Sequence, residues 1–186
     1  AITLYCAENN SGEFHNKFIT FGSRPKLCDI SGLKTLRDKL NYSYREADCS
    51  STDIEKTFKL ILNTAIENNI PQEDMPKTVL IVSDMEFNAA QGYYGKRNNS
   101  HLFKGIQRDF EGHGYKMPKL VFWNVNSRTN TIPITENENG VVIMSGFSKN
   151  LLQMAMSSET DPYKVLVAQL NKPRYEIIDK IFKNRA

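Results

Sequence analysis

The feature that most constrains the fold is a set of three continuous apolar runs, rich in β-branched and aromatic residues, at 79–82, 120–123 and 141–144. A strand with one solvent-exposed face alternates apolar and polar residues, whereas a continuous run is typical of a parallel strand covered on both faces. Helical patterns separate the runs. The sequence therefore predicts an α/β fold with a doubly wound, mostly parallel sheet flanked by helices.

The segments around these runs predict the other elements. A fourth apolar run at 18–21 predicts a strand, and 26–30 is expected to turn back beside it as a short antiparallel edge strand. The clearest helix is 53–68, whose apolar residues share one face and include Ile66. Thr52 and Glu55 have the spacing of a capping box at its start. Further helices are predicted over about 100–111, from near 148, and after Asp161-Pro162 and Lys172-Pro173.

Composition narrows the class of protein. The 24 basic and 21 acidic residues leave a net charge of +3, and 40% of the residues are hydrophobic, as in an ordinary globular domain. No apolar run approaches the roughly 18 residues of a membrane span, so no membrane partner is expected. Three cysteines are too few for a disulfide scaffold, which favours a reducing, cytoplasmic setting. No linker or repeat divides residues 1–186, which we interpret as a single domain.

Motifs for common enzyme chemistry are missing from the sequence. It has no dinucleotide-binding glycine motif, no phosphate-binding loop, no nucleophile elbow and no His-Glu-x-x-His pair. The three histidines are far apart in the chain. We therefore do not expect an enzyme.

Polar residues instead gather where the carboxyl edge of the predicted sheet lies. Asp84 directly follows the strand 79–83, Thr52 lies in the loop ahead of the long helix, and Asn126 follows the strand that ends at Trp123. Carboxylate and hydroxyl oxygens are ligands that suit Mg²⁺. The spacing by itself leaves a second interpretation open, in which Thr52 only caps the helix and Asp84 only forms a turn.

Several blocks of the sequence resemble a von Willebrand factor A-like (vWA) domain. The resemblance is greatest to the C-terminal half of an uncharacterised family of viruses, bacteria and plants that is related to the Ro/TROVE group. The blocks span nearly the whole chain: Phe18-Ile19-Thr20-Phe21, Pro25-Lys26-Leu27, Ser51-Thr52-Asp53, Met75-Pro76-Lys77-Thr78, Ser83-Asp84-Met85-Glu86-Phe87, Phe122-Trp123-Asn124-Val125-Asn126-Ser127-Arg128, Glu138-Asn139-Gly140-Val141, Ser145-Gly146-Phe147-Ser148 and Leu170-Asn171-Lys172-Pro173-Arg174-Tyr175.

The resemblance implies a metal-ion-dependent adhesion site, a Rossmann-like sheet and a missing first strand. In vWA domains the cation is held by an Asp-x-Ser-x-Ser loop after the first strand, a Thr that Thr52 matches, and an Asp that Asp84 matches. The first element would precede the helix that ends within 1–10, so the chain is expected to be truncated at its N-terminus. The missing strand would lie between 18–21 and 78–83, supplied by an upstream segment or by another chain. Asp29, in Asp29-Ile30-Ser31-Gly32-Leu33, only mimics the missing motif and is interpreted as a turn residue.

Three functions follow from this resemblance as expectations. The first is a binding module that holds Mg²⁺ through Thr52, Asp84 and upstream residues and binds an acidic group of a protein partner. A rim of aromatic, amide and cationic residues would surround that site: Tyr93, Tyr94, Arg97, Asn126 and Arg128. The second is the vWA-like part of a Ro/TROVE-type particle that binds RNA through a helical domain absent from this chain. The third is a purely structural domain.

Overall fold

The computed structural model describes residues 1–20, 22–47, 53–83, 99–124, 141–146, 152, 154 and 161–175. The chain divides into two compact units, Ala1–Ser145 and Gly146–Ala186, and the sheets and most of the described helices belong to the first. Predictions that fall on other residues, including most of the helix expected from near 148, lie outside the described part.

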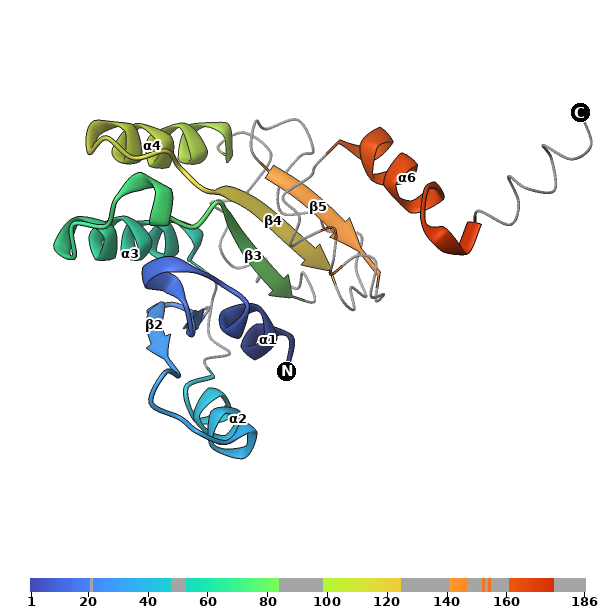
Figure 1. The fold of residues 1–186 in the computed structure, drawn as a ribbon. Coiled ribbons are helices and arrows are strands. Elements are labelled where there is room, and N and C mark those ends of the chain that lie inside the picture. The colour runs from blue at the N-terminus through green and yellow to red at the C-terminus, as the bar shows by residue number, and fades with distance from the viewer. Residues whose placement is uncertain are drawn as a thin grey trace, which may run out of the picture. The chain divides into compact units, whose positions relative to one another are not determined.

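Three apolar strands form a parallel sheet, as the sequence predicts. β3 (Thr78–Ser83), β4 (Lys119–Asn124) and β5 (Val141–Ser145) lie in the order β3-β4-β5 (Figure 1). Both pairs are parallel, and the register sets Ser83 opposite Asn124 and Asn124 opposite Ser145. The fold is therefore mixed α/β with a parallel sheet whose strands end level with one another.

Two shorter strands form a sheet of their own. β1 (Lys17–Thr20) and β2 (Lys26–Asp29) pair antiparallel, with Phe18 opposite Cys28, which confirms the predicted hairpin. Among the described residues β1 pairs with β2 and not with β3. Direct pairing of β1 with β3 would have excluded a strand between them, and it is not observed.

The described helices agree with the sequence patterns except in one place. α3 (Ile54–Glu67) and α4 (Asn99–Gly112) match their predicted ranges closely, and α6 (Pro162–Leu170) begins at the expected proline. α2 (Leu36–Arg45) was not predicted, although Leu36, Leu40 and Tyr44 recur at helical spacing, and none of its side chains is buried. The other helical segments are α1 (Ile2–Glu8) and the short 3-10 turns Gly12–Phe14, Gln72–Asp74 and Pro173–Tyr175.

The main core lies where α3 and α4 pack on the sheet. Phe58 of α3 and Phe110 of α4 are fully buried and meet edge to face, with ring centroids 6.2 Å apart. Leu120 and Phe122 of β4 complete the same cluster from the sheet. Such aromatic pairs contribute about 0.5–1.5 kcal/mol beyond the area that they bury. Ile66 is a correction to the predicted inward face, because it lies at the edge of the apolar stripe and is exposed.

Both packed helices end in the same backbone motif. Asn69 has a φ of 50°, and the N–H of Ile70 donates to the carbonyl of Ala65 at 2.9 Å. In α4 the corresponding residue is Gly114, with a φ of 77°, and the N–H of Tyr115 donates to the carbonyl of Phe110 at 2.9 Å. This Schellman arrangement satisfies carbonyls that a helix end would otherwise leave without donors.

Tyr115 joins the two helix ends. Its backbone closes α4, while its hydroxyl donates to the carbonyl of Ile70 at 2.9 Å and lies 3.3 Å from the carbonyl of Ala65 at the end of α3. The side chain is partly buried against the main core cluster. One residue therefore holds the C-terminal ends of α3 and α4 in a common position just before β3 and β4 begin.

We expect Tyr115→Phe to lower the free energy of unfolding by about 1 kcal/mol, because the ring is kept while the carbonyl of Ile70 loses its hydroxyl donor. Urea unfolding followed by circular dichroism measures this. Tyr44→Phe is the matched control, since Tyr44 is exposed and should give no shift. Equal midpoints for wild type and Tyr115→Phe would show that the bridge contributes nothing.

Candidate functional site

The carboxyl ends of the parallel strands form a level edge. Ser83, Asn124 and Ser145 occupy the same register position at the ends of β3, β4 and β5. Asp84 is the next residue of the chain after β3, and Asn126 follows two residues after the end of β4. In open α/β sheets ligands bind in the crevice outside this edge, so these two connections leave the sheet where a ligand site is expected.

The N-terminus of α3 is capped by Asp53, which corrects the predicted capping box of Thr52 and Glu55. The Asp53 carboxylate accepts a hydrogen bond from the backbone N–H of Lys56 at 3.0 Å and pairs with the ammonium of Lys56 at 2.9 Å. Glu55 pairs instead with Lys59 at 2.6 Å, on the surface of the helix. Asp is as good a cap as Thr or better, so the motif begins one residue later than the spacing suggested. Thr52 is therefore not the residue that caps α3.

The pKa of Asp53 lies below its usual value. Partial burial raises it, but the hydrogen bonds from the backbone and side chain of Lys56, together with the positive charges of Lys56 and Lys59, outweigh that effect. The carboxylate is thus stabilised in its ionised form directly after Thr52 in the chain. A negative charge at a helix N-terminus also interacts favourably with the helix dipole.

The residues proposed as cation ligands and rim lie outside the described part of the chain: Thr52, Asp84, Tyr93, Tyr94, Arg97, Asn126 and Arg128. The structure describes the elements that flank them, namely the start of α3 and the ends of β3 and β4. Within the described residues there is no cluster of three or more His, Cys, Asp or Glu side chains that would hold a metal ion.

Asp29 behaves as the turn residue that the sequence indicates. It lies at the end of β2, and its carboxylate accepts a hydrogen bond from the backbone N–H of Ser31 at 2.7 Å. Hydrogen bonds from the Ser31 side chain and backbone lower the pKa of Asp29. This local closure is an Asx turn, which explains an aspartate here without a metal.

A polar cluster that the sequence analysis missed attaches α2 to the hairpin. Lys26 of β2 pairs with Glu46, just after α2, at 2.7 Å, and Cys28 interacts with the hydroxyl of Tyr42. Burial raises the pKa of the Cys28 thiol, so it is a poor nucleophile and a structural residue. Lys26 and Glu46 are far apart in sequence, and no local pattern indicates that they meet.

Comparison with known proteins places the chain in a family. The family model described as "Domain of unknown function (DUF7788)" matches residues 1–178. The chain belongs to this family. A similar protein is the "Uncharacterized protein L728" of Acanthamoeba polyphaga mimivirus, which is 32% identical over 160 residues. The match covers 86% of this chain but 27% of the viral protein, so the chain spans about a quarter of that relative's length. No solved structure matches the chain.

Membrane insertion by a helix has no support in the described elements. None of their helices combines the length and the apolar character needed to cross a bilayer.

The N-cap of α3 leads to a prediction about pH. Because the pKa of Asp53 is lower in the folded chain than its ordinary value of 3.8, its contribution to stability is complete at neutral pH. That contribution is lost as the pH falls from about 4 through the folded pKa. We expect Asp53→Ala to cost about 1 kcal/mol at pH 7, with the difference from wild type shrinking at acidic pH, as measured by urea unfolding between pH 2.5 and 7.

Asp53→Asn is the matched variant, because its amide oxygen still accepts the bond from Lys56 but does not titrate in this range. It should keep most of the stability and lose the acid dependence that Asp53 contributes. A pH-independent difference between wild type and Asp53→Ala would contradict the ionised cap.

Proposed function

We propose that this domain is a vWA-like binding module that holds a divalent cation through Thr52 and Asp84 and binds a carboxylate of a protein partner. The observation that carries the proposal is the register at the carboxyl edge, where β3 and β4 end level at Ser83 and Asn124. The connections that contain Asp84 and Asn126 therefore leave from neighbouring strands at one edge. In this proposal the sheet is doubly wound and Rossmann-like.

The packing of α3 supports the assignment of Thr52. Ile54, the first residue of α3, and Ile81, near the end of β3, belong to the same buried cluster. The start of α3 is therefore anchored to the core that contains β3. Thr52 lies two residues before Ile54, and Asp53 already supplies the cap, so a capping role does not account for the threonine.

The chemistry of the proposed site follows from its donor types. Asp84 offers a carboxylate and Thr52 a hydroxyl, both oxygen ligands that Mg²⁺ prefers. Mg²⁺ takes six oxygens, so further residues and water would complete the shell, and one position would accept a carboxylate of the partner. Arg97 and Arg128, in the connections after β3 and after β4, supply positive charge for that carboxylate, and Tyr93 and Tyr94 supply aromatic contact.

Calorimetric titration with Mn²⁺ tests the site directly. We expect a binding isotherm for the chain, its loss in Asp84→Ala, and weaker binding in Thr52→Ala, because each change removes an oxygen ligand. Asp29→Ala is the matched control, since Asp29 closes a local turn and its loss should leave binding unchanged. Full Mn²⁺ binding by Asp84→Ala would contradict the proposed ligands, whereas absence of binding in the wild-type chain would contradict a site that assembles without the ligands of the missing first strand.

A second observation concerns the edge of β3 that faces away from β4. Val82, Trp123 and Met144 form one row across the sheet, and their exposures are 36%, 2% and 4%. In this row the side chains on β4 and β5 are buried, whereas the side chain on β3 is exposed. Natural edge strands are usually protected by charged residues, prolines or a covering segment, yet the run 79–82 is entirely apolar. β3 therefore has the composition of an interior strand.

We propose that an additional strand lies beside β3, contributed by another chain or by a segment outside these 186 residues. Ile19 of β1 packs against the same buried cluster as Val79 and Ile81 of β3, so the two sheets share one core although their strands do not pair. A strand between them would cover Val82 and extend the hydrogen-bonded sheet. The resemblance to vWA domains implies that this strand carries the remaining cation ligands.

Substitution of Val82 tests the open edge. In the 186-residue chain without an additional strand, Val82→Lys should change the free energy of unfolding by less than about 0.5 kcal/mol, because the side chain is exposed. The charge should also reduce self-association measured by sedimentation, since charged residues protect sheet edges. Val121→Lys is the matched control on the covered strand, and burial of an unpaired charge there should cost more than about 3 kcal/mol. A comparable loss from both substitutions would contradict an open edge at β3.

The RNA-binding alternative receives no specific support from the described residues. In that alternative RNA binding belongs mainly to a helical domain outside these 186 residues, and no described residue tests it.

A further inference from the structure

The outer face of α2 carries three large apolar side chains in a line. Leu36, Leu40 and Tyr44 follow one another at intervals of four residues, so they share one face of the helix. Their side chains are 64%, 40% and 87% exposed. Single exposed hydrophobic residues are normal on a protein surface, but a continuous apolar line on one helix is typical of a binding surface. We refer to these three residues as the α2 stripe.

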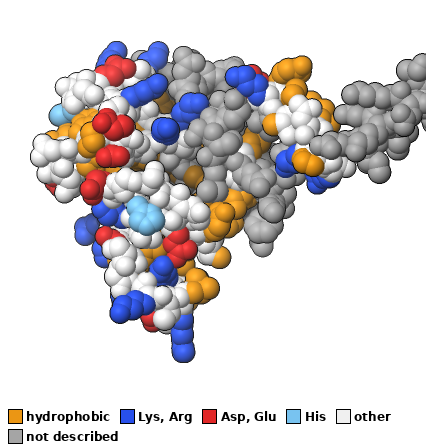
Figure 2. Space-filling model, viewed as in Figure 1, with side chains coloured by type: hydrophobic (Ala, Val, Ile, Leu, Met, Phe, Trp, Pro, Cys, Tyr) orange, Lys and Arg blue, Asp and Glu red, His pale blue; other side chains and the backbone are white. Residues whose placement is uncertain are grey.

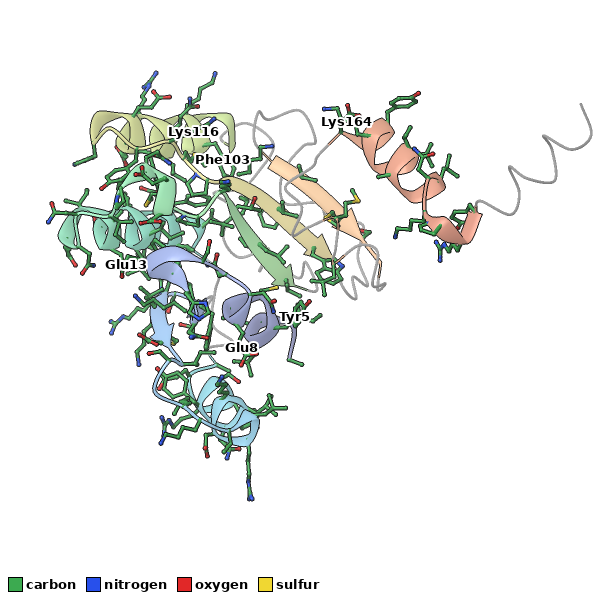
Figure 3. The ribbon with its side chains drawn as sticks, in the orientation of Figure 1. Tyr5, Glu8, Glu13, Phe103, Lys116 and Lys164 are labelled. Carbon is green, nitrogen blue, oxygen red and sulfur yellow. The ribbon has the colours of Figure 1, made fainter. Side chains whose placement is uncertain are left out.

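α2 is firmly attached to the domain by its other face. Tyr42 packs with Leu33 against the small buried cluster of Leu4, Ala7 and Ile30. Ion pairs hold the helix and the residue that follows it: Lys39 meets Glu8 of α1 at 2.6 Å, and Glu46 meets Lys26 of β2 at 2.7 Å. Glu8 extends from α1 towards α2 (Figure 3). The inward face is thus already occupied, and the α2 stripe is not needed for the fold.

The helix also has a complete N-terminal cap. The hydroxyl of Thr35 accepts a hydrogen bond from the backbone N–H of Asp38 at 3.1 Å and donates to the carboxylate of Asp38 at 2.6 Å. Because α2 is capped and is held by contacts of Tyr42, Lys39 and Glu46, its outer face has one orientation. Association with a partner would therefore not require ordering of α2, and that lowers the entropic cost of binding.

Positive charge surrounds the α2 stripe. Residues 24–46 contain six basic and three acidic side chains, and 6 − 3 gives +3, which equals the net charge of the entire chain. The remaining residues sum to zero, so the excess charge is local to this segment. Figure 2 shows hydrophobic and basic side chains next to one another at the end of the molecule that carries α2.

The acidic groups of this segment are already used. Asp29 accepts from Ser31, Asp38 bonds with Thr35, and Glu46 pairs with Lys26. Lys34 and Arg37 are exposed and have no acidic partner among the described residues. Arg37 adjoins Leu36 in the chain and lies beside the stripe on the helix surface. The surface therefore offers an apolar line bordered by unneutralised cations.

We propose that the α2 stripe is a docking surface for an acidic amphipathic helix of a partner protein. Leucine-like side chains of the partner would pack on Leu36, Leu40 and Tyr44, and its carboxylates would pair with Lys34 and Arg37. Recognition by apolar anchors three or four residues apart is a common mode of helix binding. The charge of the surface selects this occupant over a second copy, because two copies of the same basic face would repel one another. This surface is independent of the proposed cation site.

A synthetic helical peptide of about 18 residues serves as the probe, with leucines spaced three and four apart and flanking glutamates. A second peptide with every glutamate replaced by lysine is its charge control. Fluorescence anisotropy with the 186-residue chain measures both. We expect the glutamate peptide to bind, and the lysine peptide to bind at least tenfold more weakly. Arg37→Glu should reduce this preference, because it lowers the net charge of residues 24–46 from +3 to +1.

The combined variant Leu36→Ala, Leu40→Ala and Tyr44→Ala should weaken binding of the glutamate peptide about tenfold or more, because it removes the apolar anchors. Alanine is the best helix former, so α2 should stay folded, and circular dichroism checks this. Ile66→Ala is the matched control, since Ile66 is an exposed apolar residue of α3 and its loss should leave binding unchanged.

Three results would overturn the proposal. Binding that the combined variant does not weaken would show that the stripe is not the contact. Binding to vesicles of phosphatidylcholine and phosphatidylserine, without binding to the glutamate peptide, would identify a membrane surface instead. Self-association of the wild-type chain that the combined variant abolishes would identify a second copy as the occupant.

Discussion

The packing of α3 and α4 against β4 is the interaction on which the rest of the first unit depends. Phe58 and Phe110 are fully buried and meet edge to face, and Phe122 of the sheet belongs to the same buried cluster. Each helix precedes a strand of the parallel sheet, and the hydroxyl and backbone of Tyr115 hold their C-terminal ends together. The positions of the two helix ends thereby constrain where β3 and β4 begin, and equal strand lengths then make both strands end level at Ser83 and Asn124.

Side chains are less buried at β3 and α2 than in this packed centre. The two surfaces proposed to bind another strand or a partner helix lie there. β4 is covered on both faces, whereas Val82 of β3 is exposed and β3 has no second strand neighbour among the described residues. α2 lies further out, with an occupied inner face and an exposed apolar stripe. Apolar groups left in water at a sheet edge and on a helix face are both unfavourable for an isolated domain, so a covering partner would stabilise the chain at either place.

Much of the fold could be predicted because the responsible forces are local. The continuous apolar runs specify buried parallel strands, and the apolar faces of α3 and α4 are visible as helical periodicity.

Prediction from local sequence pattern failed where two local structures have similar free energies. Thr52 and Asp53 are both good caps, and only the backbone at Asp53 decides between them. Ile66 lies at the margin of an apolar face, and α2 has apolar residues at helical spacing that stay exposed instead of joining the core. The proposed ligands Thr52 and Asp84 stay predictions from sequence, since the structure describes only the elements beside them.

The sequence by itself determined most of the strands and helices, because side-chain periodicity and capping residues act within a few positions of the chain. It also places Asp84 after β3 and Thr52 before α3, the two residues proposed as oxygen ligands. Only the tertiary structure decided the strand register, the separation of the β1-β2 hairpin from the parallel sheet, and the exposure of Val82 and the α2 stripe. The physical reason is that these properties depend on contacts between distant residues, such as Tyr115 with Ile70 and Lys26 with Glu46, whose free energies no local pattern contains.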